Sequence, residues 1–135
     1  MKTVCILTAG TGSRINKYTK YINKSLLPVK NKAAISHIIE NFPEKTDFVI
    51  AVGYLKKQVK EYIKIAHPNK KIKFVKIINY KGKNSGPGFS LASCKKHLQK
   101  PFYFVSCDTI WDKKIFDEGQ KNWMGISNKF TRLNK

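Results

Sequence analysis

Two kinds of segment alternate along the chain. Short runs of mostly apolar, often β-branched residues are separated by longer segments in which apolar residues recur every three or four positions. The first kind is typical of buried strands and the second of amphipathic helices. We predict strands at Lys2–Thr8, Asp47–Val52, Ile72–Ile78 and Pro101–Cys107, with helices at Lys32–Asn41, Leu55–Ala66 and Phe89–Leu98. Weaker patterns predict a helix at Lys113–Asn122 and a short strand at Trp123–Ser127.

This order of elements predicts an α/β fold with a mostly parallel sheet covered by helices. A chain of 135 residues with 41% hydrophobic content suits one globular domain. We assign this domain to residues 1–127 and expect an irregular tail at 128–135, where no pattern is present. No apolar run approaches the roughly 18 residues of a membrane span, so we expect a cytoplasmic protein without a membrane partner.

The net charge of +19 raises nucleic acid as a partner. Against that reading, the 27 basic residues include only two arginines, Arg14 and Arg132, and the lysines are scattered along the whole chain. Arginine is preferred for bidentate contacts with phosphate and guanine. We therefore expect attraction to polyanions, nucleotides among them, and no specific nucleic-acid partner.

The cysteines and histidines do not show the spacing of a metal site. Three cysteines without a CxxC pair are best read as small buried thiols in a reducing compartment: Cys5, Cys94 and Cys107. Three histidines lie far apart and are expected at helix surfaces or boundaries: His37, His67 and His97. The tryptophans, Trp111 and Trp123, are expected in the core or at the rim of a pocket, and Trp111 lies near enough to Asp108 to line one.

Candidate chemistry begins directly after the first predicted strand. The residues Leu7-Thr8-Ala9-Gly10-Thr11-Gly12-Ser13-Arg14 are followed by Lys24-Ser25-Leu26-Leu27-Pro28-Val29. Glycines allow close approach of backbone amides to phosphate oxygens, and two cations can neutralise a triphosphate. An ordinary strand-to-helix turn with surface cations would have a similar composition. The segment is neither a Walker A loop nor a dinucleotide-binding fingerprint, because Ile15 stands where the third glycine of that fingerprint belongs.

Two later features add to this candidate site. Asn84-Ser85-Gly86-Pro87-Gly88-Phe89-Ser90-Leu91 follows a predicted strand and opens a helix, where amides can bind an anion or read a base edge. A loop of turn residues with a helix cap is the alternative. Asp108 follows the last strand, at the edge where open α/β sheets bind ligands, and can bind Mg²⁺. A turn or helix-capping aspartate is the alternative there.

Together these motifs resemble those of the sugar-1-phosphate nucleotidyltransferases, the glycosyltransferase-A-like NTP-transferases. That family has L-x-A-G-x-G-x-R, then P-K-x-L-L-P-V about ten residues later. Asn23 stands where the family usually has proline, and Cys107 precedes Asp108 where the family often has glycine. Gly86 with Ser90-Leu91 fits the family pattern G-x-x-x-[AS]-L, which lies around the nucleobase.

The resemblance implies a Rossmann-like three-layer α/β/α sandwich. It also implies Mg²⁺-dependent transfer of a nucleotidyl group from a nucleoside triphosphate to a sugar 1-phosphate or phosphocholine, with release of pyrophosphate. Arg14 and Lys24 would hold the triphosphate as catalytic residues, and Asp108 would bind the metal. The nucleotide-binding residues implied are Leu7, Ala9, Gly10, Thr11, Gly12, Gly86 and Ser90.

The resemblance covers Met1 to about Ser127 but matches the N-terminal, nucleotide-binding half of the family. Glu118 is the last acidic residue, so we find no candidate for a second metal carboxylate, and we expect a fragment, a truncated gene product or a nucleotide-binding remnant. Two alternatives to an enzyme stay open: a nucleotide-binding module without turnover and a non-specific basic nucleic-acid binder. The base, the acceptor and the formation of a homo-oligomer also stay open.

Overall fold

The computed structural model describes residues 3–111 and 121–125. Within them lies a four-stranded sheet in the order β5-β4-β1-β6. Its strands are β1 (Thr3–Leu7), β4 (Asp47–Val52), β5 (Ile72–Lys76) and β6 (Phe102–Ser106). Every neighbouring pair is parallel, which confirms the expected α/β class. All four strands expected there are present, although the third ends at Lys76, short of Ile78.

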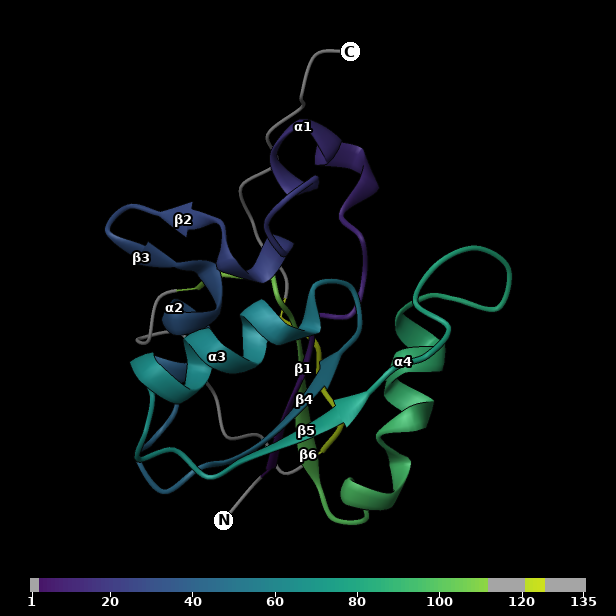
Figure 1. Cartoon of the computed structure of the whole chain (residues 1–135). Coiled ribbons are helices and arrows are strands. Elements are labelled where there is room, and N and C mark those ends of the chain that lie inside the picture. Colours follow the sequence, from purple (N-terminus) through teal and green to yellow (C-terminus); the bar gives the residue numbers. More distant parts are fainter. Residues whose placement is uncertain (1–2, 112–120, 126–135) are drawn as a thin grey trace.

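Helices cover both faces of this sheet. The helices α2 (Ala34–Glu40) and α3 (Lys56–Ala66) lie on one face and α4 (Pro87–Ser93) on the other, as Figure 1 shows. A 3-10 turn, Lys95–His97, continues from α4. These three layers are those of the expected sandwich. The helix α4 begins two residues before the predicted start, because proline at the first helical position already has a helical φ.

Several short elements were not expected from the sequence. Pro28–Val29 (β2) and Lys32–Ala33 (β3) form an antiparallel hairpin, so α2 begins at Ala34 instead of Lys32. A single helical turn, α1 (Asn16–Thr19), and a 3-10 turn over Lys24–Leu26 lie between the first strand and this hairpin. None has the length or periodicity that a sequence pattern can reveal.

The predictions near the C-terminus are tested only in part. Most of the expected helix Lys113–Asn122 lies outside the described residues, as do residues 126–135. The expected strand Trp123–Ser127 is wrong where it can be checked, because residues 123–125 have no regular structure. The ring of Trp123 instead packs edge-on against Tyr103, with ring centroids 6.2 Å apart.

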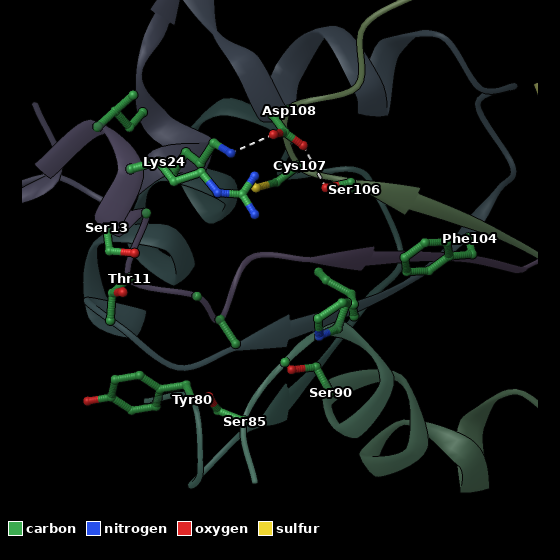
Figure 2. Close-up of a pocket in the computed structure, with 18 residues that line it drawn as sticks. Thr11, Ser13, Lys24, Tyr80, Ser85, Ser90, Phe104, Ser106, Cys107 and Asp108 are labelled. Carbon is green, nitrogen blue, oxygen red and sulfur yellow. Dashed lines mark hydrogen bonds and ion pairs between the residues drawn. The ribbon is translucent and has the colours of Figure 1, made fainter. Parts of the chain in front are cut away.

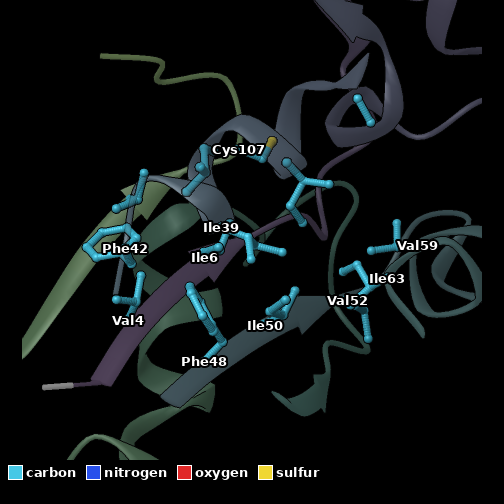
Figure 3. Close-up of a cluster of buried hydrophobic side chains, with 14 residues drawn as sticks. Val4, Ile6, Ile39, Phe42, Phe48, Ile50, Val52, Val59, Ile63 and Cys107 are labelled. Carbon is cyan, nitrogen blue, oxygen red and sulfur yellow. The ribbon is translucent and has the colours of Figure 1, made fainter. Parts of the chain in front are cut away.

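The apolar core has two parts, one on each face of the sheet. Alternate strand residues, among them Val4, Ile6 and Phe48, face α2 and α3 (Figure 3), where they pack against a group of buried helix residues: Ile35, Ile38, Ile39, Val59 and Ile63. On the opposite face, Cys5 and Val49 pack with Cys94 beneath α4. Burial of both faces explains why the strands appear in the sequence as continuous apolar runs.

The strand order creates a ligand-binding position. From β1 the chain adds β4 and β5 on one side, whereas β6 pairs with the other edge of β1. The strand order therefore reverses at β1 and β6, and open α/β sheets bind ligands outside the carboxyl ends of the strands at such a point.

None of the helices in the described part of the chain is long and apolar enough to cross a membrane.

A buried polar cluster joins α2 to α3. The Ser36 hydroxyl shares hydrogen bonds of 2.8 Å with the hydroxyl of Tyr62 and with Nε2 of His67. Burial lowers the pKa of His67, with a smaller lowering by Lys70 and Lys32 that Glu40 opposes. The imidazole is therefore held in its neutral form between the two helices.

We expect the free energy of unfolding to fall as the pH drops from about 8 to about 5. Because the folded pKa of His67 is lowered, the unfolded chain takes up a proton that the folded state resists. This contribution is fully present above the unfolded pKa of about 6.5 and is lost as the pH falls through the folded value. Urea unfolding at a series of pH values measures it.

The matched variant is His67→Gln, which keeps a polar side chain but cannot titrate. Its stability should depend less on pH across the same range. The lowered pKa values of Glu40 and Asp108 place their titration below this window. An identical pH slope in His67→Gln and the native protein would contradict the assignment.

Candidate nucleotide-binding pocket

A pocket of about 530 Å³ opens at the carboxyl ends of β1 and β6. Three parts of the chain form its walls, as Figure 2 shows: the loop after β1 together with Lys24, the loop that leads into α4, and the end of β6. Its lining residues are Leu7, Ala9, Gly10, Thr11, Gly12, Ser13, Arg14, Ile15, Lys24, Tyr80, Ser85, Gly86, Pro87, Ser90, Phe104, Ser106, Cys107 and Asp108.

The loop after β1 is anchored before it reaches the pocket. The Thr8 hydroxyl donates to the Ala51 carbonyl at 2.8 Å, and the Tyr54 amide donates to the Ala9 carbonyl at 2.9 Å. Gly12 has a left-handed φ of 65°, and a Cβ there would lie 2.8 Å from Cγ2 of Thr19. The path of this loop therefore requires glycine at position 12.

The second wall is the start of α4. Gly86 has φ 134° and ψ 173°, a conformation that side-chain-bearing residues rarely adopt, and its carbonyl accepts from the Ser90 amide at 3.1 Å. Ser90 is only 6% exposed. Within the described ranges its hydroxyl has no hydrogen-bond partner, and Ser90 lines the pocket (Figure 2). A ligand could therefore use this hydroxyl as a donor or an acceptor.

The third wall, at the end of β6, faces Lys24 of the first wall across an ion pair. Nζ of Lys24 lies 2.5 Å from Oδ2 of Asp108, and the Ser106 hydroxyl donates to Oδ1 at 2.6 Å. The Lys24 contact and then the Ser106 hydrogen bond lower the pKa of Asp108, so the carboxylate is ionised at neutral pH. The aspartate side chain is still 48% exposed, so both partners remain within reach of a ligand.

Cys107 also lines the pocket, but its thiol is not activated. Burial raises its pKa to about 11, with a further contribution from the neighbouring Asp108 carboxylate. A thiol in this state is neutral at physiological pH and is a poor nucleophile and metal ligand. The lining therefore offers cationic and hydrogen-bonding groups, and its thiol is neutral.

The structure brings every candidate site residue into this one pocket. The loop after β1, Lys24, Gly86 with Ser90, and Asp108 all line it, although they span more than 100 residues of sequence. Arg14 is exposed and has no ion pair with any residue that the structure describes. Their roles toward a nucleotide remain predictions. Trp111 lies outside the lining and packs in the core against Phe42, with ring centroids 5.6 Å apart.

Some contributors were missed by the sequence analysis. Ser106 lies two residues before Asp108, and alternation along a strand could have placed both on one side. Tyr80 and Phe104 line the pocket although no motif marks them. The sequence pattern marks Asn23 only as a residue that replaces the usual proline. In the structure its side chain is fully buried beside Lys24 and makes a network of hydrogen bonds.

Comparisons with known proteins agree with this geometry. A family profile described as the MobA-like NTP transferase domain matches residues 4–119. The chain is 29% identical to the bifunctional protein GlmU of Methanococcus maripaludis over 91% of its own length. It is 33% identical to choline-phosphate cytidylyltransferase of Streptococcus pneumoniae over 86% of its length. A putative glucose-1-phosphate thymidylyltransferase structure from Bacillus anthracis superposes with a TM-score of 0.71 at 24% identity, over 83% of this chain and 46% of the other.

The chain matches only part of these relatives. It spans 29% of the Methanococcus protein and 48% of the cytidylyltransferase. The residues matched by the family profile, 4–119, contain the sheet and the pocket described above.

We expect Gly86→Ala to destabilise the fold by about 1–3 kcal/mol, because a Cβ opposes the φ of 134°. Gly88→Ala is the matched control two residues later. Position 88 lies in α4 without a positive φ, and a Cβ there meets no atom within 4 Å. Alanine there should be neutral or stabilising, by up to about 1 kcal/mol. Urea unfolding compares the two, and equal stabilities would show that the loop does not require this conformation.

Proposed function

Because the chain belongs to the MobA-like NTP transferase domain family, we propose that its pocket binds a nucleoside triphosphate and supports transfer of the nucleotidyl group to a phosphorylated small molecule. The observation that supports this proposal is that Arg14, Lys24 and Asp108 all line one pocket at the carboxyl edge of the sheet. Two cations and a loop of backbone amides suit a triphosphate.

The relatives support the acceptor class. They include a choline-phosphate cytidylyltransferase and a D-glycero-alpha-D-manno-heptose 1-phosphate guanylyltransferase. These names share a phosphate-bearing acceptor and differ in the base that is transferred. We therefore propose a sugar 1-phosphate or phosphocholine as the acceptor class, and the comparisons favour no particular base.

The proposed reaction is a direct displacement. An oxygen of the acceptor phosphate attacks the α-phosphorus, and the bond from that phosphorus to the α–β bridging oxygen breaks, so that pyrophosphate leaves with the bonding electrons. Arg14 and Lys24 would neutralise the charge of the phosphates, and the loop after β1 would hold them in place. No covalent intermediate with the protein is required, which agrees with the neutral Cys107 thiol.

The residues Lys24 and Asp108 suit the binding of a divalent cation only when a phosphate group is bound as well. Asp108 supplies an ionised, accessible carboxylate, but no group of three potential metal-binding side chains occurs in residues 3–111 and 121–125. Mg²⁺ is commonly held by one or two carboxylates together with substrate phosphates. When bound, Mg²⁺ would offset phosphate charge at the reacting centre. Asp108 would hold it, and Lys24 would exchange its contact with Asp108 for a phosphate oxygen.

Two other functions remain as alternatives. A binding module without turnover would use the same pocket and would differ in lacking pyrophosphate release. Non-specific binding of nucleic acid would rest on the net charge of +19 and would weaken steeply with salt. A cytoplasmic location is part of the proposal, because free, buried cysteines suit a reducing compartment.

Calorimetry with ATP, CTP, GTP, UTP and dTTP, each with and without Mg²⁺, tests the proposal. We expect Mg²⁺-dependent binding of at least one triphosphate, and pyrophosphate release when a sugar 1-phosphate or phosphocholine is added. Asp108→Asn keeps the side-chain shape but removes the charge, so it should abolish the dependence on Mg²⁺. A folded protein that binds none of the five would overturn the proposal. Binding without pyrophosphate release would support the binding module instead.

Lys24→Ala should weaken triphosphate binding about 10- to 100-fold and nucleoside binding by less than about twofold. The variant loses a charge-assisted contact to phosphate, worth about 1.5–3 kcal/mol, that a nucleoside cannot make. Lys45→Ala is the matched control, because Lys45 is exposed in the turn before β4, at the amino edge of the sheet. Equal losses for nucleoside and triphosphate would show that Lys24 does not contact phosphate.

A further inference from the structure

The segment between the loop after β1 and the β2–β3 hairpin pairs with no strand of the sheet. Its backbone is held instead by Tyr54 from the β4–α3 connection and by Gln58 from the first turn of α3. The Tyr54 hydroxyl donates to the carbonyls of Thr19 and Lys20, at 2.9 Å each. Gln58 Nε2 donates to the carbonyl of Tyr21 at 2.8 Å. Three successive carbonyls are therefore bound by two side chains.

Asn23 completes this set of contacts from inside the segment. Its side chain is fully buried, and Nδ2 donates to the carbonyls of Thr8 at 3.0 Å and Tyr54 at 2.7 Å. Its Oδ1 accepts from the Ser25 amide at 2.9 Å and from the Ser25 hydroxyl at 2.7 Å. Its own amide donates to Gln58 Oε1 at 3.2 Å. Both donors and both lone pairs of the carboxamide are used, which is the full capacity of this side chain.

These contacts converge on Lys24. Asn23 caps the 3-10 turn that begins at Lys24, and the residues on either side of Lys24, Asn23 and Ser25, are both fully buried. The lysine backbone is therefore fixed, whereas its side chain reaches into the pocket as far as Asp108 (Figure 2). Fixing the base of a flexible side chain limits the positions that its ammonium group can take.

We propose that Asn23, supported by Tyr54 and Gln58, is a positioning residue that sets Lys24 against the phosphates of the bound nucleotide. This rests on the proposed function, since it assigns a role within the same pocket. Asn23 does not itself line the pocket, so it acts through Lys24. Through the Thr8 carbonyl it also joins the turn that holds Lys24 to the residue that follows β1, where the loop of the pocket begins.

The backbone of Asn23 shows what its side chain achieves. Asn23 has φ −64° and ψ 140°. Proline fixes φ near −65° through its ring. The hydrogen bonds of Asn23 therefore hold the backbone at nearly the same φ angle without a ring. The two residues are alternative ways of presenting the lysine that follows, and Asn23→Pro becomes a rescue variant.

The test compares Asn23→Ala with Ser36→Ala, using the triphosphate that the native protein binds best and the matching nucleoside. Ser36 is also buried and hydrogen-bonded, but it lies between α2 and α3, outside the pocket lining. Both variants should be less stable than the native protein. Asn23→Ala should lose roughly tenfold in triphosphate affinity and less than about twofold in nucleoside affinity, whereas Ser36→Ala should keep both.

Asn23→Pro recovers neither the side-chain hydrogen bonds nor the bond from the backbone amide of residue 23 to Gln58, but its fixed φ should restore most of the triphosphate affinity. If Asn23→Ala does not fold, Tyr54→Phe and Gln58→Ala, which each remove contacts nearer the surface, should show the same selective loss to a smaller degree. Equal losses for the two ligands, or a loss in Ser36→Ala as large as in Asn23→Ala, would overturn the positioning role.

A ligand-free measurement separates this proposal from the proposed function. Backbone ¹⁵N relaxation should show lower order at Lys24 and Ser25 in Asn23→Ala and native-like order in Asn23→Pro and Ser36→Ala. If no triphosphate binds to the native protein, the proposed function fails, and the relaxation data still decide whether Asn23 fixes Lys24. Unchanged order in Asn23→Ala would overturn the positioning role whatever the nucleotide experiments show.

Discussion

The chain that leaves the central strand β1 reaches the β2–β3 hairpin through a segment that pairs with no strand of the sheet. Most residues of this segment are exposed, so water can satisfy their backbone groups, but a fixed path requires specific partners in the protein. Here side chains supply them, with Tyr54 and Gln58 binding successive carbonyls and Asn23 joining the segment to the end of β1. The shape of the pocket wall that contains Lys24 follows from this network.

The second constraint is electrostatic. The chain has 27 basic and eight acidic residues, so an exposed carboxylate beside a pocket is a scarce feature. Lys24 and Ser106 keep Asp108 ionised, and Asp108 in turn holds the lysine side chain over the pocket. In the proposed function, the Lys24 ammonium group would leave Asp108 for a phosphate oxygen of the ligand, and the Asp108 carboxylate would then be available to a cation.

The relatives show which part of a larger architecture this chain matches. It spans less than half of the cytidylyltransferase and of the thymidylyltransferase structure. The family profile matches residues 4–119, which include the parallel sheet and the glycine-containing loop. Transfer needs both a held triphosphate and an oriented acceptor. In the proposed function, Arg14, Lys24 and the loop after β1 would hold the triphosphate.

The sequence by itself determined the four strands of the sheet, the three main helices and the residues that meet in the pocket. Those features follow from local periodicity and from glycines and charges placed directly after apolar runs. Such patterns can be read from the sequence without knowing which residues come into contact in the fold.

Tertiary structure decided the rest. The β2–β3 hairpin, the pairing of Lys24 with Asp108, and the bonds of Asn23 all join residues whose proximity depends on how the elements pack. The φ angle of Asn23 is close to the one that a proline would have at this position. A proline would fix this angle through its ring, whereas the Asn23 side chain makes four hydrogen bonds, two to the carbonyls of distant residues and two to the neighbouring serine. Sequence shows which residue stands at position 23, but its hydrogen-bond partners exist only once β1 and the β4–α3 connection have come together.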